Sequence, residues 1–286
     1  MATRRRRKIT RRAETSRHFL LSQTDSRKVE EAPDVGAERI CQALAAAFPD
    51  LLCGADFRQA ALSRVGEGPF CALAIRPDDP PEAWAEAPGA GVLAAAAAGL
   101  EECSRGAAGV WGVAEFGMLA GVWPTWGAAE GLAAAERLQE QVHLRTGRTV
   151  TVGAAEHPLL DDPPQAALEN ARKAADHAAF FGPGSRVAFD AVSLNISGDK
   201  FYERGDVPAA IREFQQALRL DPRNGNVHNS LGVCYGVLGE HERALEAFGQ
   251  AIGLDGGDYM AVYNSGLIHG LQGRREAALE CLLKAG

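Results

Sequence analysis

The sequence predicts an α+β domain, with a central sheet and flanking helices, followed by an all-α solenoid of helical repeats. Between residues 38 and 190, short apolar segments of strand length alternate with amphipathic segments of helical period. From residue 191 to 286, glycine and alanine recur every 34 residues, which is typical of a helical repeat array. Residues 1–37 are polar and densely charged, which predicts a disordered basic tail.

Composition narrows the class of protein. The chain has 286 residues, 46% of them hydrophobic, and a net charge of −7, which argues against nucleic acid as a partner of the folded part. Six cysteines are scattered without a Cys-x-x-Cys pair, so we expect small side chains in a reducing cytosol, neither disulfides nor zinc ligands. No stretch approaches the roughly 18 apolar residues of a membrane helix, and no apolar signal-peptide core follows the basic start. These features predict a cytoplasmic protein.

The basic tail leaves two interpretations open. Arg4 to Lys8 form a cluster of cations that could contact phosphates of nucleic acid or anionic lipid. A solvated tail with no partner is the alternative.

The elements of the α+β part follow in order. The segment from Glu38 to Pro49 has the periodicity of a helix, and Phe70 to Ile75 is an apolar run typical of a buried central strand. Six further elements are expected: a helix over Val92–Cys103, a β-hairpin over Ala107–Pro124, a helix over Gly127–Leu144, a strand over Thr149–Ala154 that ends at Gly153, a helix over Pro164–Phe181 and a strand over Arg186–Phe189.

The hairpin carries the one unusual charge. Its turn is expected at Gly112–Glu115, before a second strand over Phe116–Trp123. Glu115 is a carboxylate at the tip of a nearly uncharged hairpin, flanked by small residues. It could present a metal ligand, or it could be a solvated turn residue.

This hairpin resembles the signature hairpin of the GGDEF (diguanylate cyclase) family. Gly112-Val113-Ala114-Glu115-Phe116 stands in place of Gly-Gly-Asp-Glu-Phe. The resemblance extends over about residues 49–190 and includes the opening segment Asp50–Arg58 and the strand Thr149–Ala154. It implies a GGDEF-like sheet with flanking helices, in a family that joins two GTP molecules at a metal-bound site.

The positions that carry this chemistry in the family are altered here. The first metal-binding Asp falls on Arg76, which cannot bind a cation, so only Glu115 remains, and one carboxylate is a poor magnesium site. The other altered positions are those for guanine within Pro80–Ala90, for phosphate at Ala179 and Pro183, and for the product-inhibition Arg-x-x-Asp at Cys103 and Gly106. The resemblance therefore implies a degenerate domain with no catalytic residues, a vestigial Glu115 and no cofactor.

The C-terminal part resembles the tetratricopeptide (TPR) repeat. Five positions coincide at the period of 34 residues: Gly198/Gly232/Gly266, Gly205/Gly239/Gly273, Ala210/Ala244/Ala278, Phe214/Phe248/Leu282 and Ala217/Ala251/Ala285. Small residues at these places let two antiparallel helices approach closely, and each repeat buries its face against its neighbours. The pattern predicts two complete repeats and an incomplete third.

The resemblance implies a concave face that binds a protein or an extended peptide. The residues placed on it are Asn195, Asp199, Asn229, Val233, Met260, Tyr263 and Leu267. Asn195 and Asn229 could form a ladder that bonds a peptide backbone, or they could be solvated. The lysine-rich clamp with which some TPR proteins bind a C-terminal carboxylate is absent, since Lys200 is the only lysine of the first two repeats.

The last predicted helix presents three apolar residues, Leu279, Leu282 and Leu283, with no further solubilising helix after it. A solenoid needs a polar outer face on its terminal unit. Either the natural chain continues with more repeats, or this edge packs against the GGDEF-like domain, a second copy of the chain or a partner. Self-association through this C-terminal edge is the outcome that we expect to measure.

Three functions remain open from the sequence. The first is a non-catalytic scaffold or regulator in bacterial signalling, with a degenerate GGDEF-like domain coupled to a TPR interaction module. The second is a sensor that binds GTP or cyclic di-GMP without turnover. The third is an active diguanylate cyclase with an unusual site, the one case that would require Mg²⁺.

Overall fold

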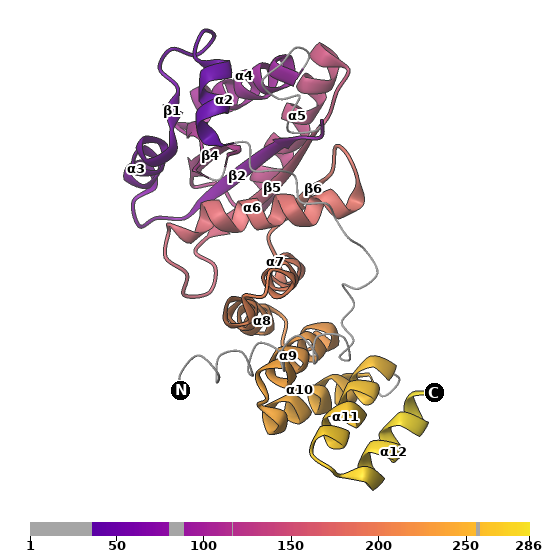
Figure 1. The fold of residues 1–286 in the computed structure, drawn as a ribbon. Helices are drawn as coiled ribbons and strands as arrows, with labels where there is room; N and C mark the ends of the chain where they lie inside the picture. Colours follow the sequence, from indigo (N-terminus) through magenta and orange to yellow (C-terminus); the bar gives the residue numbers. More distant parts are fainter. Residues whose placement is uncertain (1–35, 80–88, 116, 256–257) are drawn as a thin grey trace, which may run out of the picture. The chain divides into compact units, whose positions relative to one another are not determined.

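The computed structural model describes residues 36–79, 89–115, 117–255 and 258–286 (Figure 1). The chain forms two compact units, and the boundary between them falls between Ser193 and Leu194. Each unit is described by itself below. The basic cluster at Arg4–Lys8 lies outside the described residues. So do residues 80–88, most of the segment in which the family's guanine-binding residues were predicted to be lost.

The first unit is built on a six-stranded mixed sheet with the order β1-β3-β4-β2-β5-β6. The strands are β1 (Leu52–Cys53), β2 (Phe70–Pro77), β3 (Val110–Val113), β4 (Leu119–Pro124), β5 (Val150–His157) and β6 (Arg186–Ala188). The central strand β2 pairs antiparallel with both β4 and β5, while β1 and β6 pair parallel with β3 and β5. Strand β2 is buried along nearly its whole length, which explains its uninterrupted apolar run.

Helices cover both faces of this sheet (Figure 1). They are α2 (Ala37–Leu44), α3 (Gly54–Val65), α4 (Gly89–Ala107), α5 (Ala128–Thr146) and α6 (Ala166–Ala178), which continues as the short 3₁₀ helix η3 (Ala179–Phe181). One core packs α2, α4 and α5 against the sheet around the fully buried Trp123. The other packs α3 and α6 around Phe57 and Phe70. The predicted mixed sheet with flanking helices is therefore confirmed.

Two local predictions were wrong. The hairpin turn lies later than Gly112–Glu115, because Val113 still pairs with Leu119 and the turn occupies the residues between them. Strand β5 does not end at Gly153. A Cβ at Gly153 would lie 2.1 Å from the carbonyl oxygen of Ala171, so the glycine allows α6 to pack closely on a strand that continues to His157.

The prediction that the cysteines form no disulfide was also wrong. Cys41 of α2 and Cys53 of β1 are joined by a disulfide across 12 residues, and the other four cysteines are free. Spacing along the chain gave no sign of this pair, because the two residues meet only after α2 folds back beside β1.

The second unit consists of antiparallel helix pairs. The helices are α7 (Ala191–Glu203), which begins in the first unit, α8 (Val207–Leu220), α9 (Gly225–Leu238), α10 (His241–Leu254), α11 (Tyr259–Leu271) and α12 (Arg275–Ala285). Asp206, Asn224 and Asp258 cap the N-termini of α8, α9 and α11 by accepting hydrogen bonds from backbone N–H groups. Gly198 and Gly232 each face a phenylalanine ring, Phe214 and Phe248, so closely that a Cβ would lie 2.5 Å from it. The period of 34 residues is therefore a packing period.

Among the helices of the described residues, none has both the length and the apolar character that crossing a bilayer demands.

Candidate functional site

Glu115 lies at the exposed tip of the hairpin and is ion-paired. Its Oε2 atom is 2.6 Å from Nη1 of Arg58, which projects from α3, and about half of each side chain is exposed. An arginine in this position neutralises the carboxylate that would otherwise attract a cation. The carboxylate of Glu115 is thus paired with a guanidinium.

Arg76, at the end of β2, forms part of an ion-pair network. Its Nη1 lies 3.5 Å from Oδ1 of Asp176 in α6, and both side chains are largely buried. Asp176 also accepts a 2.7 Å hydrogen bond from Arg172, which in turn pairs with Glu169. Burial lowers the pKa of Arg172, but the hydrogen bonds and charges of Glu169 and Asp176 outweigh that effect and raise the pKa overall. Arg76 therefore links β2 to α6 through an ion pair.

Asp78 has a structural role as well. Its carboxylate accepts hydrogen bonds from the Thr151 hydroxyl of β5 and, at 2.7 Å, from the backbone N–H of Gly184. These bonds hold the end of β2 to β5 and to the loop before β6. Within residues 36–79, 89–115, 117–255 and 258–286, no group of three or more His, Cys, Asp or Glu residues is arranged to hold a metal ion.

A cavity of about 470 Å³ lies between α4 and α5. Its lining includes Cys103 and Gly106, the positions matched to the product-inhibition motif, together with Trp126 and Arg137. Burial raises the pKa of the Cys103 thiol, while the charge of Arg137 acts in the opposite direction. The volume is within the range of small-molecule sites, but the lining also includes the carboxylates Glu102 and Glu140.

The predicted peptide-binding residues divide into two groups. Met260, Tyr263 and Leu267 lie on α11 with partly exposed side chains. Asn195 of α7 is also partly exposed, but its Oδ1 atom is buried and has no hydrogen-bond partner among the described residues. The three side chains of α11 are accessible to a ligand, whereas the amide oxygen of Asn195 is not.

Asp199, Asn229 and Val233 are instead buried, at 7%, 1% and 1% exposure. Asn229 accepts a 3.0 Å hydrogen bond from Nδ2 of Asn264. The expected ladder of Asn195 and Asn229 along an open face is therefore replaced by an amide pair between α9 and α11. The prediction that Asp199, Asn229 and Val233 lie on an open face is corrected, because all three are buried. Asn264 of the next repeat covers Asn229.

Two accessible residues of α11 were missed. Tyr259 is 59% exposed and Leu271 is 62% exposed, at the two ends of the helix that carries Tyr263. The signal that could have found them is position, since both lie on the first helix of the third repeat. Apolar side chains exposed along one helix are a common feature of protein interaction surfaces.

The C-terminal edge is exposed as the sequence suggested. Leu279, Leu282 and Leu283 of α12 are 59%, 38% and 73% exposed. Self-association through this edge stays a prediction.

Comparison with known proteins places TPR repeats in this second unit. A family model described as TPR repeat matches residues 198–239, and one described as tetratricopeptide repeat matches residues 226–258. The C-terminal part therefore contains TPR repeats, as predicted.

Individual relatives cover only part of the chain. Stress-induced-phosphoprotein 1 of Caenorhabditis elegans is 31% identical over 77 residues, which are 27% of this chain and 22% of that protein. The chain thus spans about a fifth of the length of the curated relative it matches. Among solved structures, MamA is 29% identical over 34% of this chain and 56% of its own, with a TM-score of 0.33. The second TPR of Spaghetti (RPAP3), bound to the HSP90 peptide SRMEEVD, is 23% identical over 34% of this chain and 89% of its own, with a TM-score of 0.33.

Proposed function

We propose that this protein is a non-catalytic scaffold or regulator that binds a protein or peptide partner through its TPR unit. The observation that carries the proposal is the TPR unit itself, with family-model matches over residues 198–258. Its helix α11 presents the partly exposed side chains of Met260, Tyr263 and Leu267. Because TPR arrays are interaction modules, binding is the function that this unit supports best.

We further propose that the first unit is a degenerate GGDEF-like domain in cytoplasmic bacterial signalling. Its support is the resemblance of residues 49–190 and a sheet in which the hairpin β3–β4 lies directly beside the central strand β2. Two ion pairs in this unit weigh against catalytic turnover. Arg76 is ion-paired with Asp176 where a metal ligand is required, and Glu115 is ion-paired with Arg58.

The accessible groove residues suggest the chemistry of the ligand. Met260, Tyr263, Leu267 and Asn195 are uncharged, so this surface suits an uncharged, partly apolar peptide. None of these four side chains is a guanidinium or ammonium group that could pair with an acidic C-terminal peptide of the type bound by the RPAP3 domain. We therefore expect the ligand class to differ from SRMEEVD.

The experiment is a peptide selection on the full-length chain, followed by affinity measurements by fluorescence polarisation. Selected peptides should bind at least tenfold more weakly to Tyr263→Asp. The matched control is Gln250→Asp, which puts the same charge on an exposed position of α10 and should bind as the wild type does. If Tyr263→Asp and Gln250→Asp bound the selected peptides equally well, the proposed groove would be contradicted. If SRMEEVD displaced the selected peptides, the proposed ligand class would be contradicted.

A second candidate function rests on the cavity between α4 and α5. Its volume of about 470 Å³, with Trp126 and Arg137 in the lining, is compatible with a nucleotide sensor that binds GTP or cyclic di-GMP without turnover. Thermal unfolding with each nucleotide distinguishes the two, because a bound ligand raises the melting temperature by mass action. A rise that is lost in Arg137→Ala favours the sensor, and an unchanged melting temperature favours the scaffold.

A further inference from the structure

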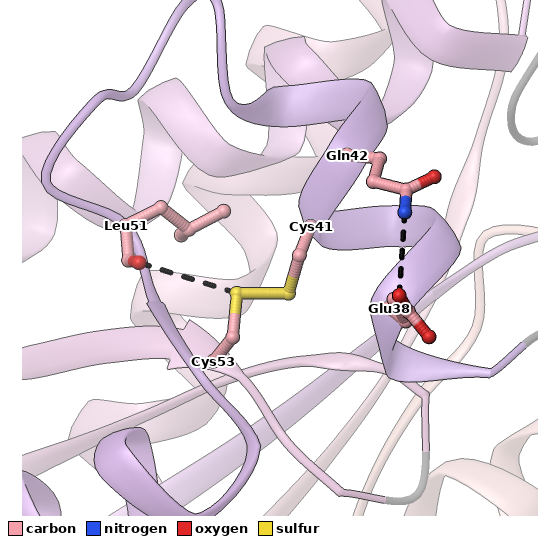
Figure 2. Close-up of a disulfide and its surroundings, with 5 residues drawn as sticks. All are labelled: Glu38, Cys41, Gln42, Leu51 and Cys53. Atoms are coloured by element: carbon pink, nitrogen blue, oxygen red, sulfur yellow. Dashed lines mark hydrogen bonds between the residues drawn. A yellow bond between two sulfur atoms is a disulfide. The ribbon is translucent and has the colours of Figure 1, made fainter.

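The disulfide between Cys41 and Cys53 closes the N-terminal edge of the sheet (Figure 2). Cys41 is on the short helix α2 and Cys53 is the last residue of β1. Both cysteines are partly exposed, and Sγ of Cys53 lies 4.0 Å from the carbonyl oxygen of Leu51. We therefore expect a small thiol to reach this bridge.

The segments that the bridge joins are short, and between them the ring of Phe48 packs edge-on at 5.3 Å against Trp111 of β3. Helix α2 has eight residues and buries two of them, Ile40 and Leu44. Strand β1 has two residues, which pair with Gly112 and Val113 of β3. The pairing is close, since a Cβ at Gly112 would lie 2.4 Å from the carbonyl oxygen of Leu52. A two-residue strand gains little from its own hydrogen bonds, so the covalent link contributes much of its order.

The same segment leads directly to the hairpin tip. Cys53 immediately precedes α3, which carries Arg58 and its 2.6 Å ion pair with Glu115. A Cβ at Gly54 would lie 3.9 Å from Cγ of Glu115. The residues from the bridge to Arg58 therefore form one side of the surroundings of Glu115, and a change in their order reaches the tip of the hairpin.

The other cysteines are poorly suited to redox chemistry. Burial raises the pKa of Cys71 and that of Cys234 to about 12 each, and it also raises the pKa of Cys103 and of Cys281. Thiols with raised pKa values contain little thiolate at neutral pH and react slowly. The bridge is thus the cysteine centre of this chain that exchange chemistry reaches most readily.

We propose that Cys41–Cys53 is a reversible redox modification site that controls the order of β1 and of the hairpin tip. A dithiol attacks one sulfur, the Cys41–Cys53 bond breaks, and a mixed disulfide forms. The second thiol of the dithiol then displaces the protein sulfur. Two electrons and two protons reach the two cysteines, and the dithiol leaves as its cyclic disulfide. This site is independent of the proposed TPR function, because it lies wholly within the first unit.

The test is hydrogen exchange with mass spectrometry on the full-length protein, before and after reduction by dithiothreitol. Alkylation without reductant should label none of the sulfurs of Cys41 and Cys53, and alkylation after reduction should label both. Reduction should speed amide exchange at least tenfold in peptides covering residues 45–58 and 110–115. Peptides from residues 225–254 should be unchanged.

Variants separate this site from a general effect of reductant. Cys41→Ser should exchange at the fast rate in residues 45–58 without reductant and should not respond to dithiothreitol. Cys103→Ser, a matched change at another partly exposed cysteine, should respond as the wild type does. Should Cys41→Ser fail to fold, the reduced wild-type chain supplies the same comparison. Labelling of Cys41 and Cys53 without reductant, or exchange that is unchanged by reduction, would overturn the proposal.

Discussion

Asn264 of α11 donates a hydrogen bond of 3.0 Å from Nδ2 to Oδ1 of Asn229 in α9, and both residues are at most 1% exposed. Two first helices of successive TPR repeats are thereby joined by a buried polar contact. A buried amide is tolerated only where its hydrogen bonds are made. This pair therefore fixes the register of one repeat on the next.

Replacing Asn264 by alanine should destabilise the TPR unit by about 1–3 kcal/mol, because it leaves a buried amide oxygen of Asn229 without this donor. The double variant Asn229→Ala/Asn264→Ala should lose less than the sum of the single losses, since the two residues are coupled. Urea unfolding followed by circular dichroism measures both, with the exposed Gln250→Ala as the control. Additive losses would show that the pair does not act as a unit.

Close packing at the repeat glycines gives a graded prediction. A Cβ at Gly232 would lie 2.5 Å from the ring of Phe248, whereas one at Gly266 would lie 3.1 Å from the flexible side chain of Leu282. Gly232→Ala should therefore cost about 1–3 kcal/mol, and Gly266→Ala should cost clearly less. Denaturant midpoints of the two variants give the order, and a reversed order would contradict the packing described.

These two features also show how much the sequence could predict. The glycine period could be identified from one chain, because Gly198, Gly232 and Gly266 each meet a side chain of the second helix in their own repeat. The burial of Asn229 could not, because its partner Asn264 lies 35 residues away, one residue off the period. The repeat period predicted the face of the helix on which Asn229 lies, but it did not predict that Asn264 covers this side chain.

The first unit shows the same limit. The apolar run from Phe70 to Ile75 predicted the central strand, because a strand buried on both faces needs apolar residues throughout. The pairing of Cys41 with Cys53, and that of Arg58 with Glu115, depends on where α2 and α3 pack. The periodicity of apolar residues does not predict where these helices pack, so it could not predict either pair.

Asp176 should be essential to the first unit. Its largely buried carboxylate pairs with both Arg76 and Arg172, so Asp176→Ala leaves two guanidinium groups without this acceptor. We expect a loss of about 3 kcal/mol in the free energy of unfolding. Glu140→Ala, an exposed acidic residue of α5, is the control and should change it by less than about 0.5 kcal/mol. Equal losses of unfolding free energy in Asp176→Ala and Glu140→Ala would contradict a structural role for the ion pairs of Asp176.

Asp190 should make the stability of the first unit depend on pH in the acidic range. Burial raises its pKa, but hydrogen bonds from His177 and from the backbone N–H of Ser193 outweigh this and hold the pKa below its ordinary value of 3.8. A lowered pKa contributes stability that is present above the ordinary value and is lost as pH falls through the folded pKa. The stability difference between wild type and Asp190→Asn should therefore shrink as pH is lowered from 5 to about 3. A difference that grows on acidification would contradict this assignment.

The central claim is that this chain acts by binding and not by catalysis. The most direct measurement is incubation of the full-length protein with GTP and Mg²⁺, followed by chromatographic detection of cyclic di-GMP. In the proposed degenerate GGDEF-like domain, Arg76 stands where a cyclase would need a metal ligand and is ion-paired with Asp176, so we predict no product above a control without protein. Sustained product formation that disappears in Glu115→Ala would contradict the account and establish an active cyclase.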